Sequence, residues 1–452
     1  MKNTVGFVCF GEVNTPIDRL QLKHDGALKA LGGLEAEWID AGLVIDDPGY
    51  ETADAAIARL QQQDLTAIVL CVAGWVPTHA VIRVTDPFRH LPMVLWGLCG
   101  WREDDRIVTT AEQAGTTALR PALEAMDYTF KFVYNVIDDP EPIEEIDSYL
   151  RAAFAARRLR SARVGTMGYR DMLLYGTQYE GNSMRGQIGV EVEPFEMLEI
   201  VRAAEGADAA EVARWTAWIR ENWRILKPCD DSILEKGVRY ALAIAARVRD
   251  RGYDALTLID VDGMKKLLGF PPAIVFMLLE RMCGVCTTPE NDVMGNVTQL
   301  MVRYLTGQTA HYMEYYEFFR ESMLIGVPDY IPVPAIDGDV ELLPTAFGLL
   351  DASLLNVSKV RPGYVTCARL YYKKGRYYLH MYTGEARKPP KWEEFGWAPP
   401  APQLPSLEVF PDSCTVPEFA QKVSSQHVIV CYGDESRALT ELCGLLGITV
   451  IR

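Results

Sequence analysis

The segment most informative about chemistry is residues 287–317, which begins with two acidic residues close together. Glu290 and Asp292 follow Thr287 and Thr288, and they precede an apolar-periodic helix that we expect over residues 293–305, with Gly307 placed to end it. The two acids therefore stand at a strand-to-helix corner, on the edge where open α/β sheets bind their ligands. An acidic helix cap that complements the helix dipole is the alternative interpretation.

A further acid and two histidines lie in predicted strands. Glu314 belongs to residues 308–318, an aromatic, β-prone stretch. A carboxylate in such a strand costs free energy unless it is paired, metal-bound or exposed to water. Alternation places His311 on the opposite face from Glu314, so we expect His311 to be structural. His427 begins an apolar strand near the C-terminus, where a lone histidine is commonly a satisfied polar residue.

The elements that would position these side chains form two similar series of predicted strands and helices. Short apolar runs alternate with helical stretches through the first 160 residues, and the pattern begins again at residue 161. Apolar strands separated by helices are typical of a parallel sheet with both faces covered. We therefore predict an α/β protein that begins with two consecutive doubly wound α/β domains, at 1–160 and at 161–325. The second of these domains carries Glu290 and Glu314.

The pattern changes after residue 325. Period-two alternation runs through residues 363–386 on either side of Lys374-Gly375, which predicts a β-hairpin. The proline-rich stretch 389–411 is expected to be extended and irregular. We predict that residues 326–452 form an antiparallel, β-barrel-like domain with a final αβ element that carries His427.

The composition excludes several broad classes of protein. The chain has 452 residues, 45 Lys and Arg against 61 Asp and Glu, a net charge of −16, and 49% hydrophobic residues. This acidic balance argues against nucleic acid or an anionic membrane as a partner, since phosphate binding needs a basic face. The longest strongly apolar stretch, residues 67–76, is too short to span a bilayer. The 10 cysteines show no framework spacing, so we expect reduced thiols and a cytoplasmic protein.

One segment resembles a known family of enzymes. The run TPENDVMGNVTQLMVRYLTG, residues 288–307, is similar to the metal-site segment of L-fucose isomerases, in which a Thr-Glu-Asn-Asp run leads a helix that ends in Leu-Thr-Gly. Seven positions past that glycine the family has a second metal-ligating carboxylate, an aspartate, and this chain has Glu314. The family's third ligand, a strand histidine, matches His427, with Gln426 where the family has asparagine. L-Arabinose isomerases are more distant members with the same architecture.

The resemblance implies a metal-dependent aldose–ketose isomerase. Glu290, Glu314 and His427 would be the metal ligands, with Mn²⁺ as the cofactor and Mg²⁺ or Co²⁺ as substitutes. The two glutamates would also be the acid/base pair that moves a proton between C1 and C2 through a cis-enediol, and which of them is the base stays open. The substrate would be an open-chain pentose, a 6-deoxyhexose or a C6-modified hexose such as the sulfonated sugar sulfoquinovose.

The resemblance also implies residues that contact the sugar. Trp96, in MVLWGLCG, and Trp392, in KWEEFGWAPP, match tryptophan segments of the family, and Gln426 precedes the metal histidine. Asp260, at the end of a predicted strand, is a candidate for a hydrogen bond to a sugar hydroxyl or for a structural turn. Arg19 and Arg170 are candidates for holding an anionic end of the sugar, or they are surface charges.

The family assembles as hexamers or related oligomers, so the resemblance implies a homo-oligomer. Trp96 and Arg19 would then belong to the site of an adjacent subunit. Two other classes of function stay open at this point. One is a non-catalytic sugar-binding or regulatory relative, and the other is a metal-dependent epimerase or lyase that uses the same enediol.

Overall fold

The structure is a computed structural model that describes residues 3–328, 330–345, 353–392 and 403–452. The chain divides into two compact units, Met1–Arg157 and Arg158–Arg452. Among the described residues, every helix is too short or too polar to cross a lipid bilayer.

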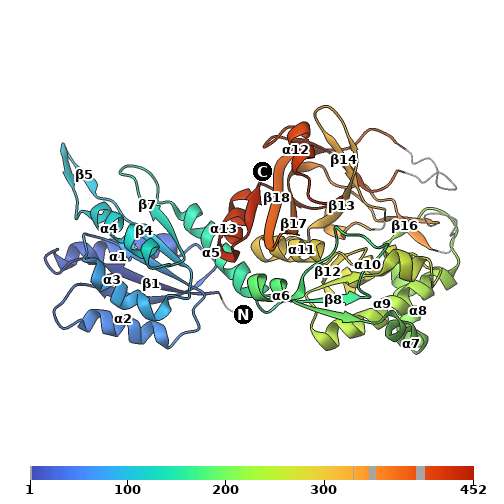
Figure 1. Cartoon of the computed structure of the whole chain (residues 1–452), viewed down its shortest axis with the longest axis horizontal. Helices are drawn as coiled ribbons and strands as arrows, with labels where there is room; N and C mark the ends of the chain where they lie inside the picture. Colours follow the sequence, from blue (N-terminus) through green and yellow to red (C-terminus); the bar gives the residue numbers. More distant parts are fainter. Residues whose placement is uncertain (1–2, 329, 346–352, 393–402) are drawn as a thin grey trace. The chain divides into compact units, whose positions relative to one another are not determined.

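The first unit contains a five-stranded parallel sheet in the order β2-β1-β3-β4-β7 (Figure 1). This is one of the two common doubly wound strand orders. The central strands β1 and β3 are buried along their whole length, which explains why they read as unbroken apolar runs. Its strands are β1 (Thr4–Phe10), β2 (Glu37–Val44), β3 (Ala67–Val72), β4 (Met93–Gly97) and β7 (Phe130–Tyr134), with a hairpin of β5 (Trp101–Glu103) and β6 (Arg106–Val108). Its helices are α1 (Ile17–Leu31), α2 (Glu51–Gln61), α3 (Thr78–Thr85), α4 (Glu112–Ala125) and α5 (Ile143–Leu159), the last of which runs into the second unit.

The second unit begins with a four-stranded parallel sheet in the order β12-β11-β8-β9. Its strands are β8 (Arg163–Met167), β9 (Glu191–Phe195), β11 (Ala255–Leu258) and β12 (Cys286–Thr288). Helices α7 (Met197–Glu205), α8 (Ala209–Asn222), α9 (Asp231–Arg251) and α10 (Ala273–Cys283) share one hydrophobic core with it. The parallel sheets confirm the predicted α/β class. A small sheet joins β10 (Arg224–Ile225), β15 (Glu341–Pro344) and β16 (Leu354–Asn356).

The same unit contains a closed barrel of six antiparallel strands. Their order is β17-β20-β13-β14-β19-β18, and pairing between β17 and β18 closes the ring. The strands are β13 (His311–Phe318), β14 (Met323–Gly326), β17 (Gly363–Lys373), β18 (Arg376–Arg387), β19 (Ser406–Pro411) and β20 (His427–Tyr432). The same unit also contains α6 (Gly181–Ser183), α12 (Val416–Lys422), α13 (Ser436–Leu446) and β21 (Thr449–Ile451), which pairs with β18.

The barrel confirms the predicted antiparallel architecture and corrects one detail of it. Residues 389–411 were expected to be irregular, but residues 406–411 form strand β19, because their backbone groups pair with β14 on one side and with β18 on the other. The barrel also includes β13 and β14, which lie before or across residue 325. The boundaries predicted at 160 and 325 stay predictions.

Helix α11 (Val293–Thr306) joins the sheet to the barrel. It contacts β8, β11 and β12 of the sheet and β17 and β20 of the barrel, and Figure 1 shows it between them. Nearly every residue of α11 is buried, as expected of a helix that is covered on all sides. The helix thus fixes the corner before it, residues 289–292, against both layers.

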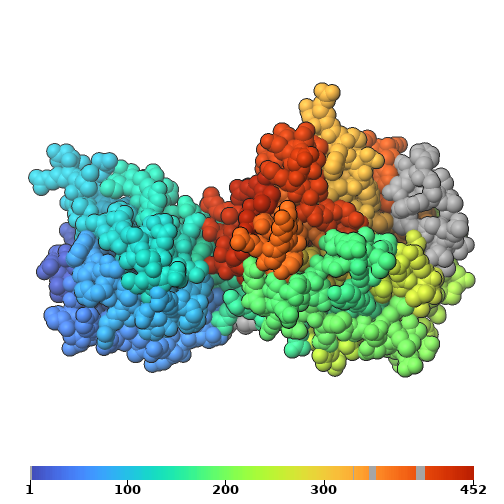
Figure 2. Space-filling view, viewed as in Figure 1, coloured from blue at the N-terminus to red at the C-terminus, as the bar shows by residue number. Residues whose placement is uncertain are grey.

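The segment between β8 and β9 also reaches the barrel. The Tyr377 hydroxyl donates a hydrogen bond to the Glu180 carbonyl, at 3.5 Å, and the Arg369 guanidinium donates to the Gly176 carbonyl, at 2.9 Å. Figure 2 shows the green atoms of this segment against the orange atoms of the β17–β18 hairpin.

Candidate metal centre

The strand-to-helix corner after β12 is built from residues in an uncommon backbone conformation. Glu290 and Asn291 both have positive φ, 62° and 52°. Non-glycine residues adopt this region only where their surroundings compensate for the strain. Here the Asp260 carboxylate accepts a hydrogen bond from the Glu290 backbone N–H, and the Asn291 side-chain amide donates to Thr166 Oγ1 and to the Met167 carbonyl. These bonds tie the corner to the carboxyl ends of β8 and β11.

The barrel supplies the other two side chains. Glu314 of β13 and His427 of β20 are directly opposite each other in the antiparallel ladder. Opposed residues of such a pair project from the same face, so the two side chains lie next to each other. His427 Nε2 is 3.0 Å from Glu290 Oε2 and 3.5 Å from Glu314 Oε1. The structure thus brings together all three residues predicted as metal ligands.

The geometry of this group fits a divalent cation. One ligand atom from each of Glu290, Glu314 and His427 lies within 4.8 Å of the others. An ion about 2.1 Å from each ligand holds the ligand atoms about 3–3.5 Å apart. Glu290 Oε2 is buried, and beyond His427 no described group donates a hydrogen bond to it, so it has coordination capacity to spare. Two carboxylates and one imidazole suit Mn²⁺ or Mg²⁺ and also other first-row ions.

Burial and mutual repulsion set the charges of the site. Burial raises the pKa of Glu290, and the neighbouring His427 opposes that rise. Burial disfavours the imidazolium form, but hydrogen bonds to Asp292, Glu290 and Glu314 raise the pKa of His427 well above its ordinary value. The neighbouring carboxylates therefore favour the protonated ring, and a cation that binds Nε2 competes with a proton there.

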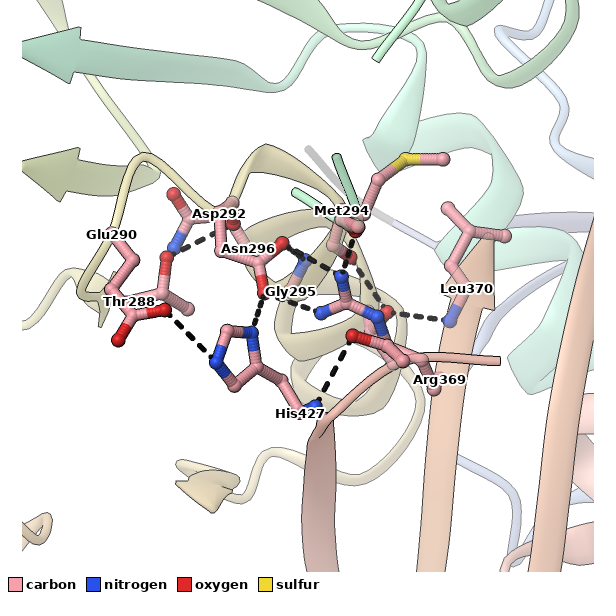
Figure 3. Close-up of polar contacts among 12 residues, drawn as sticks. Thr288, Glu290, Asp292, Met294, Gly295, Asn296, Arg369, Leu370 and His427 are labelled. Atoms are coloured by element: carbon pink, nitrogen blue, oxygen red, sulfur yellow. Dashed lines mark hydrogen bonds and ion pairs between the residues drawn. The ribbon is translucent and has the colours of Figure 1, made fainter. Parts of the chain in front are cut away.

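Asp292 and Arg369 complete the polar group, as Figure 3 shows. Arg369 donates to both carboxylate oxygens of Asp292, at 2.6 and 2.9 Å, and His427 Nδ1 is 3.0 Å from Asp292 Oδ2. Burial alone would raise the pKa of Asp292, but Arg369 and His427 outweigh it and hold the pKa of this carboxyl well below its usual range. Arg369 and His427 therefore favour the ionised form of Asp292.

Sequence reasoning did not find Arg369. The residue is 2% exposed and lies on an inward position of β17, with apolar or small neighbours on both sides. One signal was available, because a lone arginine within the apolar run TCARLY needs a buried partner. The partner could not be named from the sequence, since Asp292 is 77 residues away.

Two residues predicted to bind substrate contact side chains of the barrel strands. Gln426 is exposed, and its side-chain nitrogen is 2.9 Å from His427 Nε2. Trp392 is half-buried, with its ring 5.7 Å from the Tyr316 ring and its Nε1 donating to Ser406 Oγ at 3.3 Å. The rest of the KWEEFGWAPP motif, residues 393–400, lies outside the described residues.

Asp260 and Arg170 both make local structural bonds. The buried Asp260 carboxylate holds the backbone of Glu290. The Arg170 guanidinium donates to the carbonyls of Leu173 and Leu174 and stacks on the Tyr175 ring at 4.2 Å. These contacts favour the structural interpretation of each residue, and a contact with a sugar stays a prediction.

The remaining two candidates belong to the first unit. Trp96 lies in β4 with no exposed surface in this chain, and its Nε1 donates to Asn135 Oδ1 at 2.7 Å. Arg19 is exposed and lies over the Trp101 ring, 5.4 Å from its centroid. Their predicted roles in a neighbouring subunit's site stay predictions, and for Trp96 that role would require the ring to be uncovered.

Comparison with known proteins adds no family to this description. No protein-family model matches the chain, and no curated protein matches it in sequence.

Proposed function

We propose that this chain is a divalent-metal-dependent aldose–ketose isomerase. The observation that carries the proposal is the convergence of Glu290, Glu314 and His427, from a strand-to-helix corner and two barrel strands, on one point at the edge of a buried polar group. The similarity of residues 288–307 to the metal segment of L-fucose isomerases supports the same assignment. Mn²⁺ is the proposed ion, and Mg²⁺ and Co²⁺ are the proposed substitutes.

The side chains have different access to solvent. Glu314 is 22% exposed, whereas Glu290 and His427 are 7% and 1% exposed. A sugar therefore reaches the centre from the Glu314 side. A bound divalent cation would polarise the sugar's C1 and C2 oxygens. It would thereby make the C–H bond on the carbon next to the carbonyl more acidic. In this proposal Glu290 and Glu314 are the acid/base pair that takes the proton from one carbon and returns it to the other.

Several parts of this proposal rest on the resemblance alone. These are the open-chain pentose, 6-deoxyhexose or C6-modified hexose as substrate and the homo-oligomeric state. The proposed cytoplasmic location rests instead on the scattered cysteines. The acidic balance of the chain remains the argument against nucleic acid as a partner.

The test is turnover of a sugar panel followed by ¹H NMR in D₂O. The protein is stripped with EDTA, and Mn²⁺ is added back. The panel contains L-fucose, D-arabinose, L-arabinose, L-rhamnose, D-glucose and sulfoquinovose. We expect Mn²⁺-dependent ketose formation from at least one sugar, with deuterium entering at C1 or C2 because a carboxylate exchanges the proton with solvent.

Glu290→Gln should abolish both Mn²⁺ binding and turnover while the protein stays folded. Glu317→Gln is the matched control, because Glu317 is an exposed carboxylate on the same strand as Glu314. Full activity of Glu290→Gln would refute the proposed centre. Mn²⁺ binding at one site per chain without turnover of any sugar would instead favour a non-catalytic sugar-binding protein or an untested substrate.

A further inference from the structure

The Asp292 carboxylate makes more contacts than a helix cap requires. Its Oδ1 accepts from the Gly295 N–H, which is the capping bond, at 2.9 Å, and from Arg369 at 2.9 Å. Its Oδ2 accepts from the other Arg369 nitrogen at 2.6 Å and lies 3.0 Å from His427 Nδ1. By comparison, the carboxylates of the exposed caps Asp208 and Asp230 each accept one backbone N–H bond, at the starts of α8 and α9. Helix capping thus accounts for the bond from Gly295 to Oδ1. It does not account for the contacts of Oδ2 or for the buried Arg369 beside the carboxylate.

The contact with Oδ2 determines which nitrogen of His427 faces the two glutamates. A carboxylate only accepts hydrogen bonds, so Nδ1 carries the proton that points at Asp292. The lone pair of the neutral ring is then on Nε2, the atom that lies between Glu290 and Glu314. Histidines that ligate metals commonly donate their other N–H to a carboxylate, which fixes the tautomer and the orientation of the ring.

Arg369 in turn fixes Asp292. Its two nitrogens hold both carboxylate oxygens in a planar fork, and a third bond, to the Gly176 carbonyl at 2.9 Å, anchors the fork itself. Gly295 leaves the space for this arrangement, since a Cβ there would lie 3.0 Å from Asp292 Oδ2 and 3.2 Å from Arg369 Nη1. The Arg369 fork and the capping bond from Gly295 therefore hold the carboxylate in its contact with His427.

We propose that Asp292 and Arg369 are positioning residues of the metal centre. Asp292 holds His427 in the Nδ1–H tautomer with Nε2 toward Glu290 and Glu314, and Arg369 holds Asp292. This inference rests on the proposed metal site and assigns two residues that the proposed ligand set does not contain.

The first test is the Mn²⁺ affinity of Asp292→Asn, measured by EPR of free Mn²⁺. Asparagine caps a helix as well as aspartate does, but its amide can donate to Nδ1 and so favours the tautomer with a proton on Nε2. We expect the dissociation constant to rise about 10–100-fold. Electron-spin-echo modulation from a bound imidazole nitrogen should weaken in parallel. Asp230→Asn is the matched control, because it makes the same change at the cap of α9, and its affinity should equal that of the wild type.

A double-variant cycle separates positioning from general damage to the fold. If Asp292 acts through His427, Asp292→Asn has no further effect on the affinity once His427→Gln has been made. Arg369→Lys keeps the charge and loses the fork, so it should weaken Mn²⁺ binding in the same direction and provides a second variant if Asp292→Asn does not fold.

The outcomes distinguish a failure of the positioning roles from a failure of the metal centre. Wild-type affinity in Asp292→Asn and Arg369→Lys would overturn the inference and leave the metal centre standing. An equal loss from Asp292→Asn with and without His427 would also overturn it, because the effect would not pass through the ring. If the wild-type protein binds no Mn²⁺ at all, the proposed function fails and the inference fails with it.

Discussion

Replacing Arg369 by methionine should destabilise the second unit strongly. Methionine has a similar length, so the main change is the loss of a buried positive charge. Asp292, which is fully buried, would keep its negative charge and lose two of its hydrogen bonds. The Gly176 carbonyl would lose its donor as well.

The size of the effect follows from the remaining partners. Removing one member of a buried ion pair commonly costs about 3–5 kcal/mol, because the other charge stays buried without compensation. Asp292 still has the Gly295 N–H at 2.9 Å and His427 Nδ1 at 3.0 Å, so we expect the lower end, about 3 kcal/mol. The double variant Arg369→Met/Asp292→Asn contains neither buried charge and should recover part of this loss.

Hydrogen exchange of peptides that cover α11 measures the effect within the second unit alone. The free energy of opening should fall in Arg369→Met, while peptides from β1 in the first unit stay unchanged. Arg220→Met is the matched control, because it removes an ion pair with Asp231 whose members are 37% and 65% exposed and should cost at most about 1 kcal/mol. If Arg369→Met costs no more than Arg220→Met, the buried pair does not stabilise the corner and the reasoning is refuted.

Two further predictions concern packing and pH. Gly295→Ala should lower the urea midpoint, because a Cβ there would be in close contact with Asp292 and Arg369. Gly444→Ala, in α13 with open space around the added Cβ, should instead raise the free energy of unfolding by about 0.5–1 kcal/mol. Equal stabilisation of both variants would contradict this prediction. Burial lowers the pKa of His380 to about 4, and Lys422 adds to the effect. The unfolded imidazole titrates near pH 6.5, so this histidine leaves stability intact above that pH and reduces it as the pH falls from about 6.5 to about 4. His380→Phe should therefore flatten the acid limb of the stability profile by about 1.4 kcal/mol per pH unit, and an unchanged slope would show that another group is responsible.

The local parts of the fold were predictable from the residues. The Lys374-Gly375 turn joins β17 and β18 as expected, and both residues have the positive φ that a tight hairpin turn needs. Gly307 ends α11 in the left-handed conformation that its position predicted. These features depend on neighbours within a few residues, so the sequence carries their whole cause.

The irregular-looking stretch before β20 shows where local reasoning fails. The prolines around residues 406–411 argue against a strand. These residues nevertheless form β19, because their backbone groups hydrogen-bond to β14 on one side and to β18 on the other. The strand therefore forms because the barrel closes around it. The residues near it in sequence do not predict it.

The residue types of the site can be recognised along the chain: an acid-bearing corner before a helix, a glutamate in an aromatic strand and a histidine at the start of another. That these side chains meet depends on long-range pairing, because the contact between Glu314 and His427 requires β13 to pair with β20 in one particular register. The same closure brings Arg369 to Asp292 and Asp292 to His427, which are 77 and 135 residues apart. Long-range pairing is selected by the packing of the whole barrel against α11, so no short segment of the chain specifies it.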